Sequence, residues 1–388
     1  VYGKDTPNFI ANRIGTYGMV SVFKHMDRLG ADVETVDVVF GSPMGRAKSA
    51  VFRTADLVGL DTLDHVFGNV YNNCTEDEER EGFKSPVWLR KMIDEGTLGN
   101  KTGKGFYQKS KDGNGKRLIM VRDLGTGEYA PVRKPRFDSV KAAKKAGGTG
   151  SSIKAMIGGE DIASQLAWAC TSDILVYSAN RIPEIADDVV NIDRGMKWGF
   201  GWELGPFETW DAIGVRESVG RMESEGRAVT TWVKNMLDSG RESFYAREGG
   251  KVTYWDPSSG SAKPVPSHRS WLLLKDITSE RSNIVKSNPS ANLLDLGDGI
   301  LGLEFRSKMN VIETGNVQMY SDALDLLDDG QYRGLVVGNQ DGRAFCAGAN
   351  IFMVLMGAMQ GQWDQIEKLI SDLQTTLQRA KYCNAPVV

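Results

Sequence analysis

The sequence has few of the residues that most often act in catalysis or bind metals. Its 388 residues include three histidines and four cysteines. The cysteines are isolated from one another and show no metal-ligand spacing, which argues against a structural metal site and against a disulfide framework; they are Cys74, Cys170, Cys346 and Cys383. Scattered cysteines of this kind are typical of a reducing compartment, and we expect a cytoplasmic protein.

Long apolar runs and a strong charge of either sign are also absent. The longest apolar run, Ile351 to Met359, is nine residues and falls far short of a membrane span. The formal net charge of −3 provides no overall attraction to nucleic acid. The length is sufficient for two or three domains. Because Val1 is not a natural initiator and the chain ends in a strand-like Pro-Val-Val, we expect a fragment of a longer polypeptide.

The first strong pattern is KDTPNFIANR, from Lys4 to Arg13. Thr6 is a residue type that caps helices, Pro7 suits a first turn, and an apolar stripe begins at Phe9. The pattern predicts a mostly buried helix with Asn12 near its N-terminus. A carboxamide in that place is either a satisfied polar group of the core or a group directed at a ligand, and its position alone favours the first.

The whole string resembles the start of the C-terminal domain of 3-hydroxyacyl-CoA dehydrogenases, which has the pattern D-T-P-x-F-x-x-N-R. LGNKTGKGFY, from Leu98 to Tyr107, resembles the end of that domain, L-G-x-K-T-G-x-G-F-Y. It does not have the phosphate-loop order G-x-x-x-x-G-K-[ST], and we interpret it as a glycine-rich turn that locks the last helix to the domain. The resemblance implies that Asn12 contacts the reacting 3-oxygen of the substrate. It also implies that NAD is bound by a domain preceding Val1.

The chain after residue 159 repeats the part before it. Four anchors recur at the same spacing, Phe52, Thr54, Asp56 and Gly59 in the first copy and Phe207, Thr209, Asp211 and Gly214 in the second. The second copy has no counterpart of Asn12, so we expect it to be structural. The dehydrogenase resemblance implies that both copies are all-α and complete each other's core. We therefore predict helical domains over 1–132, with a small hairpin, and over 160–265, joined by a linker over 133–159.

A second linker-like stretch, 266–291, precedes a region of α/β character over 292–388. Gly297, Gly299 and Gly302 satisfy the dinucleotide pattern G-x-G-x-x-G. They lie between two strand-like runs, however, whereas a dinucleotide loop must open a helix whose N–H groups bind the pyrophosphate. The pattern therefore predicts a hairpin turn. A helix over 316–327 and a strand over 334–337 are expected to follow.

DGRAFCAGANI, from Asp341 to Ile351, resembles the enoyl-CoA hydratase (crotonase) motif G-x-x-F-x-A-G-A-[DN]. The resemblance implies that the Ala349 N–H donates to the thioester oxygen of the substrate, while Gly348 lets the backbone approach it. An enolate at a thioester needs two such donors in a water-excluded site. The expected fold class is thus mainly α, with two all-α dehydrogenase C-terminal-like domains followed by the N-terminal part of an α/β crotonase-like domain.

Together, these resemblances predict that the parent protein is a bifunctional β-oxidation enzyme. It would oxidise (S)-3-hydroxyacyl-CoA to 3-ketoacyl-CoA with NAD and hydrate trans-2-enoyl-CoA, and its helical domains would form a homo-oligomer or another assembly. Neither site is complete in this chain, so we expect the chain alone to be inactive. Two alternatives stay open: a non-catalytic module for dimerisation or assembly, and a dehydrogenase fused to an enoyl-CoA isomerase-type enzyme.

Overall fold

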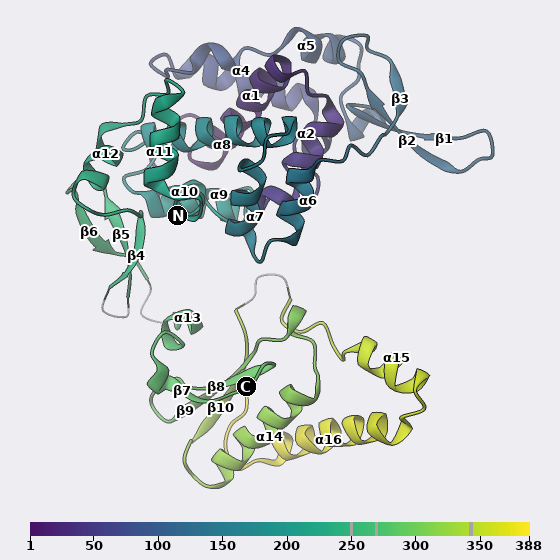
Figure 1. Ribbon diagram of the computed structural model, residues 1–388, viewed down its shortest axis with the longest axis vertical. Coiled ribbons are helices and arrows are strands. Elements are labelled where there is room, and N and C mark those ends of the chain that lie inside the picture. The colour runs from purple at the N-terminus through teal and green to yellow at the C-terminus, as the bar shows by residue number, and fades with distance from the viewer. Residues whose placement is uncertain (249–250, 268–270, 341–343) are drawn as a thin grey trace. The chain divides into compact units, whose positions relative to one another are not determined.

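The computed structural model describes residues 1–248, 251–267, 271–340 and 344–388. These residues form two compact units, each with a hydrophobic core of its own. Unit 1 contains Val1–Arg247 and Val252–Val265, and unit 2 contains Glu248–Lys251 and Pro266–Val388. In Figure 1, unit 1 runs from purple through teal to green, and unit 2 runs from green to yellow.

Unit 1 consists of helices and two small antiparallel sheets. Its helices are α1 Ala11–Leu29, α2 Val33–Val39, α3 Phe52–Val58, α4 Leu60–Asn73, α5 Val87–Asp94, α6 Asp138–Lys145, α7 Thr149–Ile157, α8 Ile162–Asn180, α9 Val189–Gly199, α10 Pro206–Ile213, α11 Val215–Ser224 and α12 Thr231–Asp238. The strands are β1 Tyr107–Lys111, β2 Arg117–Arg122 and β3 Tyr129–Pro131 in one sheet, and β4 Tyr245–Glu248, β5 Lys251–Asp256 and β6 Ser261–Pro264 in the other. One sheet therefore follows the helices of each copy.

The centre of unit 1 is the antiparallel pair of α1 and α8. Near the start of α1, Arg13 donates to the hydroxyl of Tyr177, which lies near the end of α8. Further along α1, Ser21 donates to Asp173, which precedes Tyr177 on α8. The rings of Tyr17 and Tyr177 stack with their centroids 3.8 Å apart. Helix α1 belongs to the first copy and α8 to the second, and α8 is buried along almost its whole length. The contact between these two helices therefore joins the two repeated halves.

The sequence repeat is also a repeat of contacts. In the first copy, Asp56 accepts the backbone N–H groups of Phe106–Tyr107 at 2.8 and 2.9 Å. In the second, Asp211 accepts those of Phe244–Tyr245 at 2.7 and 2.9 Å. Glycine is required at Gly105, since a Cβ there would lie 1.9 Å from Asp56 Oδ1. LGNKTGKGFY therefore contains a glycine-rich turn, as predicted, and its contacts with Asp56 tie the turn to α3.

Because of Asp56 and Asp211, we expect the free energy of unfolding to depend on pH. Burial raises the pKa of Asp56 to about 6 and that of Asp211 to about 7, although their backbone donors oppose the change. The unfolded chain loses both protons near pH ~4, so the native state binds more protons above that pH, and stability falls as the pH rises towards ~7. For Asp211 alone we expect an unfolding free energy about 2–3 kcal/mol higher at pH ~5 than at pH ~8, because one pKa unit corresponds to ~1.4 kcal/mol.

Melting temperatures across this pH range test the expectation. Asp211→Asn cannot ionise, so the variant should lose much of the difference between the two pH values. The pKa of Asp77 is lowered, and its own contribution disappears only in more acidic solution, outside this window. A pH profile that is identical in the wild type and in Asp211→Asn would contradict the assignment.

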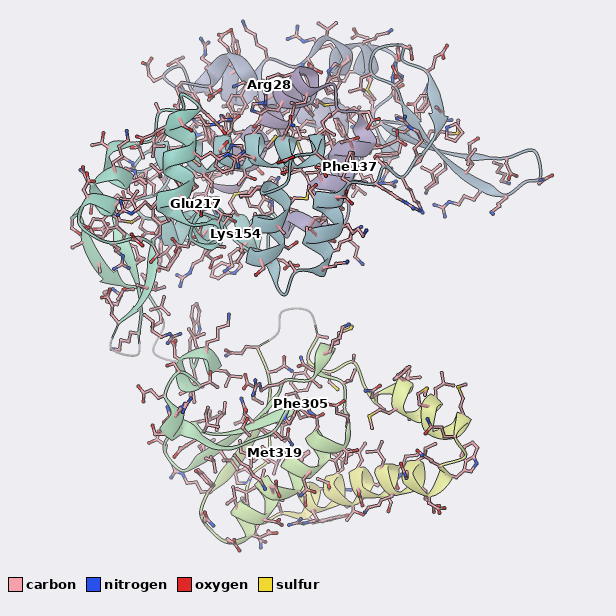
Figure 2. All side chains as sticks on the ribbon, viewed as in Figure 1. Arg28, Phe137, Lys154, Glu217, Phe305 and Met319 are labelled. Carbon is pink, nitrogen blue, oxygen red and sulfur yellow. The ribbon has the colours of Figure 1, made fainter. Side chains whose placement is uncertain are left out.

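Unit 2 is built on a four-stranded sheet in the order β10-β9-β8-β7, in which β9 pairs parallel with β10 and antiparallel with β8. Helix α14 packs on this sheet, and Phe305 of β9 and Met319 of α14 both lie in the core (Figure 2). The elements are α13 Leu274–Ile277, β7 Ile284–Ser287, β8 Ala291–Asp295, β9 Ile300–Phe305, α14 Thr314–Asp328, β10 Gly334–Gly338, α15 Ile351–Met359 and α16 Trp363–Tyr382. The helix and strand expected over 316–327 and 334–337 are confirmed as α14 and β10.

The glycine pattern of unit 2 is a turn between β8 and β9. The Leu296 N–H donates to the Ile300 carbonyl at 3.0 Å, and Gly297, Asp298 and Gly299 have φ of 86°, 51° and 70°. Left-handed backbone of this kind is typical of tight hairpin turns and favours glycine. The predicted hairpin is confirmed.

The expected fold class, mainly α with a crotonase-like domain at its end, is wrong. The residues that the structure describes are about half helical and form three sheets, so the fold is mixed α/β. The stretches expected as linkers also contain regular structure. Residues 133–159 include α6 and α7, because apolar residues at helical spacing are buried there, among them Val140, Ala143, Ile153 and Met156. Residues 266–291 contribute α13 and the edge strand β7.

Among the described residues, no helix combines the length and the apolar character needed to cross a membrane.

Candidate functional site

Asn12 lies in the first turn of α1, which begins one residue earlier. The chain before the helix forms a tight turn, in which the Phe9 N–H donates to the Thr6 carbonyl at 3.0 Å. Asn8 and Phe9 have φ of 66° and 49°, a left-handed conformation that costs more for phenylalanine than for asparagine. The predicted helix cap at Thr6 is wrong, because Thr6 belongs to this turn. Consecutive strained residues of this kind are found mainly at functional sites.

The Asn12 side chain is exposed on a helix that is otherwise mostly buried. Within the described residues, no hydrogen bond or ion pair engages its carboxamide. The first interpretation, a satisfied polar group of the core, therefore does not hold for Asn12. An amide in this position offers two donors and one acceptor to a ligand.

The next residue, Arg13, is fully buried and fixes the start of α1. Its guanidinium lies 2.6 Å from Asp77 Oδ2 and 2.9 Å from Glu184 Oε1. Its Nε donates to the Tyr177 hydroxyl at 2.7 Å. A second guanidinium, that of Arg181, lies 3.0 Å from Asp77 Oδ2. Because Asn12 precedes Arg13 on the helix, this cluster also fixes the position of the Asn12 backbone.

The charges of the Arg13 cluster compensate one another. Burial works against the ionised form of Asp77, but the hydrogen bond from Tyr177 and the charge of Arg181 hold the pKa of this carboxyl below its ordinary value. Burial also disfavours the Arg13 cation, yet Tyr177 and Asp77 raise the pKa of the guanidinium. Sequence reasoning assigned no role to this cluster. Its one sequence signal was the arginine that ends the pattern D-T-P-x-F-x-x-N-R.

The second predicted site, at Ala349, lies on a loop of unit 2. Gly348 has a φ of 87°, and its carbonyl accepts the Ile312 N–H at 2.8 Å, while the Asn350 N–H donates to the Ile312 carbonyl at 3.0 Å. These bonds flank Ala349 as in parallel pairing, so its own N–H points away from Ile312. Within the described residues that N–H has no backbone acceptor. Residues 341–343 of the motif lie outside the described residues.

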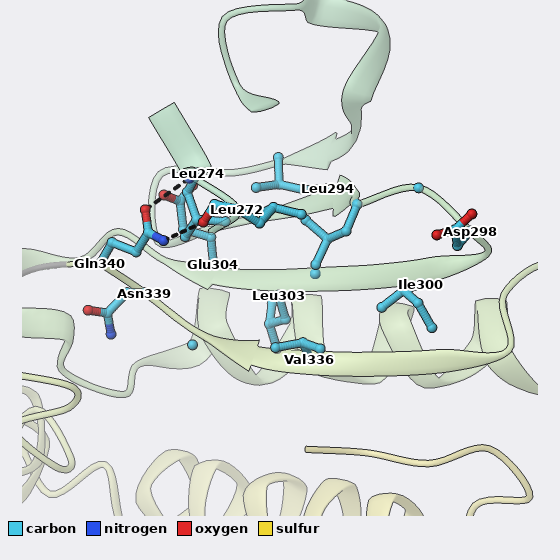
Figure 3. Close-up of a pocket in the computed structure, with 14 residues that line it drawn as sticks. Leu272, Leu274, Leu294, Asp298, Ile300, Leu303, Glu304, Val336, Asn339 and Gln340 are labelled. Atoms are coloured by element: carbon cyan, nitrogen blue, oxygen red, sulfur yellow. Dashed lines mark hydrogen bonds between the residues drawn. The ribbon is translucent and has the colours of Figure 1, made fainter. Parts of the chain in front are cut away.

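Unit 2 also contains an apolar cavity of about 440 Å³ (Figure 3). Its walls come from β8, β9 and β10 and from the chain before α13, and they include Leu272, Leu294, Leu303 and Val336. At one end, Gln340 bonds to the Leu272 carbonyl at 2.7 Å and to the Leu274 N–H at 2.9 Å. The neighbouring Asn339 donates to the carbonyl of Phe345 on the Ala349 loop. A cavity of this size and lining suits a small apolar ligand.

The two glycine-rich sequences of the described residues do not have the geometry of a dinucleotide loop. The G-x-G-x-x-G sequence joins two antiparallel strands, so no helix N-terminus is available there for a pyrophosphate. The glycine-rich turn before Tyr107 leads into strand β1 and not into a helix. Neither glycine sequence of this chain therefore forms a dinucleotide loop.

Comparisons with known proteins give a family match for the first part of the chain and relatives that match it over its whole length. Residues 9–109 match the family model described as 3-hydroxyacyl-CoA dehydrogenase, C-terminal domain. The chain is 43% identical over 388 residues to a Bacillus subtilis protein named as a probable 3-hydroxyacyl-CoA dehydrogenase, with 100% of this chain and 48% of that protein covered. It is 23% identical over 385 residues to a Rickettsia prowazekii protein named as a fatty acid oxidation complex trifunctional enzyme, with 99% and 48% covered.

The chain thus spans about half the length of the curated relatives it matches. Among solved structures, 3-hydroxybutyryl-CoA dehydrogenase from Escherichia coli is similar with a TM-score of 0.39 and 16% identity, and the match covers 61% of each chain. A score of this size carries no argument about the fold.

Proposed function

We propose that the whole protein oxidises (S)-3-hydroxyacyl-CoA to 3-ketoacyl-CoA, with NAD as its cofactor, because residues 9–109 match the 3-hydroxyacyl-CoA dehydrogenase C-terminal domain. The observation that carries the proposal is the exposed, uncommitted carboxamide of Asn12 at a helix start fixed by Arg13. The names of the relatives that span the chain support a place in fatty acid oxidation. A homo-oligomer formed through the helical unit is part of the same proposal.

In this proposal Asn12 binds and orients the substrate. Its amide N–H donates to the 3-oxygen of the hydroxyacyl group and holds that oxygen in one position. Binding in a reactive geometry restricts the motion of the substrate before the reaction, so the entropy cost of orienting it is not part of the activation barrier. NAD takes no part in this step, and neither glycine-rich sequence of the described residues forms a dinucleotide loop.

The test is an assay of the whole protein with (S)-3-hydroxybutyryl-CoA and NAD, followed by NADH absorbance. Formation of NADH that depends on the thioester supports the proposal. A whole protein that assembles into oligomers but forms no NADH would favour the alternative, a non-catalytic assembly module.

A second candidate activity, hydration of trans-2-enoyl-CoA, concerns unit 2. The observation that favours it is the Ala349 N–H, which lacks a backbone acceptor within the described residues and lies on a loop tied to Ile312. Such an N–H is a donor for a thioester oxygen. The apolar cavity that Asn339 connects to this loop offers space for an acyl chain.

Ala349→Pro tests this second activity. Proline removes the N–H, so we expect the hydration rate of the whole protein to fall at least ~10²-fold, the scale of one lost oxyanion donor. Ala349→Gly retains the N–H and should have little effect. Loss of enoyl-CoA absorbance measures the rate, and the melting temperature shows whether the variant is folded. A folded Ala349→Pro protein with the wild-type hydration rate would remove Ala349 from the site.

A further inference from the structure

The two ends of the α1 and α8 pair differ in their charge balance. At the end that carries Asn12, the cations Arg13 and Arg181 face three carboxylates, which are those of Asp77, Glu78 and Glu184. At the opposite end, a cavity of about 420 Å³ is lined by three arginines and one carboxylate, namely Arg28, Arg221, Arg227 and Glu225. Carboxylates therefore outnumber guanidinium groups at the first end, and guanidinium groups outnumber carboxylates at the second.

The single carboxylate of this cavity is fully engaged. Glu225 accepts the indole N–H of Trp168 at 2.8 and 2.9 Å and the Arg221 Nε–H at 3.0 Å. Trp168 is almost completely buried, and the guanidinium of Arg221 lies 4.0 Å from its ring centroid. Glu225 is therefore held in place and cannot move to neutralise Arg28.

Arg227 extends from the segment between α11 and α12 and points inward to Asp173. Its Nε is buried without a hydrogen-bond acceptor in the described part of the chain, since Glu225 Oε2 lies 3.5 Å away. A buried N–H of a charged group that has no acceptor is costly. The Nε itself is closed to solvent, whereas the rest of the Arg227 side chain is 22% exposed and lines the cavity.

Arg28, near the end of α1, is exposed, and no ion pair joins it to a carboxylate among the described residues. Its Nε donates to His25 Nδ1 at 3.3 Å. On the other side of the imidazole ring, His25 Nε2 lies 2.7 Å from Asp173 Oδ2. The terminal nitrogens of Arg28 have no partner among the described residues and are available to a ligand.

We propose that this cavity, lined by Arg28, Arg221 and Arg227, binds the phosphate group of a small phosphorylated molecule. Three guanidinium groups from three different segments converge on one space, and the guanidinium fork matches the oxygens of a phosphate. Even with Asp173 included, the arginines outnumber the carboxylates. Arg28 follows Asn12 by sixteen residues on one helix, or about 24 Å at the rise of an α-helix, so this site is separate from the candidate active site.

Isothermal titration of the chain with inorganic phosphate tests the proposal, with chloride at the same ionic strength as the reference. We expect saturable binding of phosphate and not of chloride. Arg28→Gln should weaken phosphate binding about tenfold, the effect of one lost charge-assisted hydrogen bond. Lys24→Gln is the matched control, because Lys24 lies on the same helix and carries the same charge but does not line this cavity. Its affinity for phosphate should stay within about twofold of the wild type.

The outcomes are distinct. Equal weakening in Arg28→Gln and Lys24→Gln would mean that phosphate responds only to the general charge of the surface, and it would overturn the site. Equal responses to phosphate and chloride would overturn it as well. Arg28→Lys retains the charge and should bind more tightly than Arg28→Gln, which shows that a loss of binding does not arise from unfolding.

Discussion

Asn12→Ala is expected to lower kcat for 3-hydroxyacyl-CoA oxidation by the whole protein about 10²-fold or more. The reason is the loss of one preorganised hydrogen bond to the oxygen that reacts. The melting temperature should change little, since the exposed carboxamide has no partner in the described structure and a substitution of this kind usually changes stability by less than ~0.5 kcal/mol. Initial rates with (S)-3-hydroxybutyryl-CoA and NAD, together with a thermal melt, measure both effects.

Asn69→Ala is the matched control for this experiment. Asn69 is also an exposed asparagine of unit 1, on α4, and no catalytic role is proposed for it. Its kcat should equal that of the wild type. If Asn12→Ala lowers the rate and the melting temperature together, Asn12 supports the fold; if kcat stays unchanged, the proposed contact with the 3-oxygen is excluded.

Several local features could be predicted because they depend on short-range patterns. Gly297 and Gly299 flank an Asp in a stretch between two apolar runs, and turn chemistry alone indicates a hairpin there. The apolar spacing over 316–327 is sufficient to predict α14, whose boundaries differ from the prediction by one or two residues. The glycine-rich turn before Tyr107 also followed from sequence, although the reason for Gly105, the close approach of Asp56, needs the folded chain.

Other features depend on residues that are distant in sequence. Asp77 meets Arg13 from 64 residues away, and Arg181 meets Asp77 from 104 residues away, and nothing in the local pattern of either segment indicates such a contact. The stretch 133–159 was misleading for a different reason. Its lysines and glycines are typical of a linker, but a few apolar residues at helical spacing, including Val140 and Met156, are enough to pack two short helices against unit 1.

The sequence motif indicated Asn12 as a site residue, whereas the pattern of apolar residues around it did not. The spacing of apolar residues places Asn12 on a mostly buried helix, which suggests a core residue. In the structure, Asn12 lies on the exposed side of α1, two residues from both Ile10 and Ile14, which are buried. Residues at that spacing face different sides of a helix, but the turn at Asn8 and Phe9 that precedes the helix is not visible in the sequence.

Arg13→Met is expected to lower the unfolding free energy of the chain by about 3–5 kcal/mol, because it breaks a buried ion pair and leaves the carboxylates short of one cation. The side chains of Arg13 and Asp77 are both 0% exposed, so water does not replace the lost guanidinium. Arg181 stays 3.0 Å from Asp77 and retains part of the compensation, which favours the lower end of the range. Urea unfolding, with the slope checked for two-state behaviour, measures the change.

Lys234→Met provides the comparison with an exposed pair. Lys234 Nζ lies 2.6 Å from Glu223 Oε1, as close as Arg13 lies to Asp77, but the two side chains are 44% and 46% exposed. Its loss should therefore cost less than ~1 kcal/mol. If both variants lose the same small amount, burial does not strengthen the Arg13 cluster. The cluster could then not hold the start of α1 firmly, and the position of Asn12 would need another explanation than the anchoring of its neighbour.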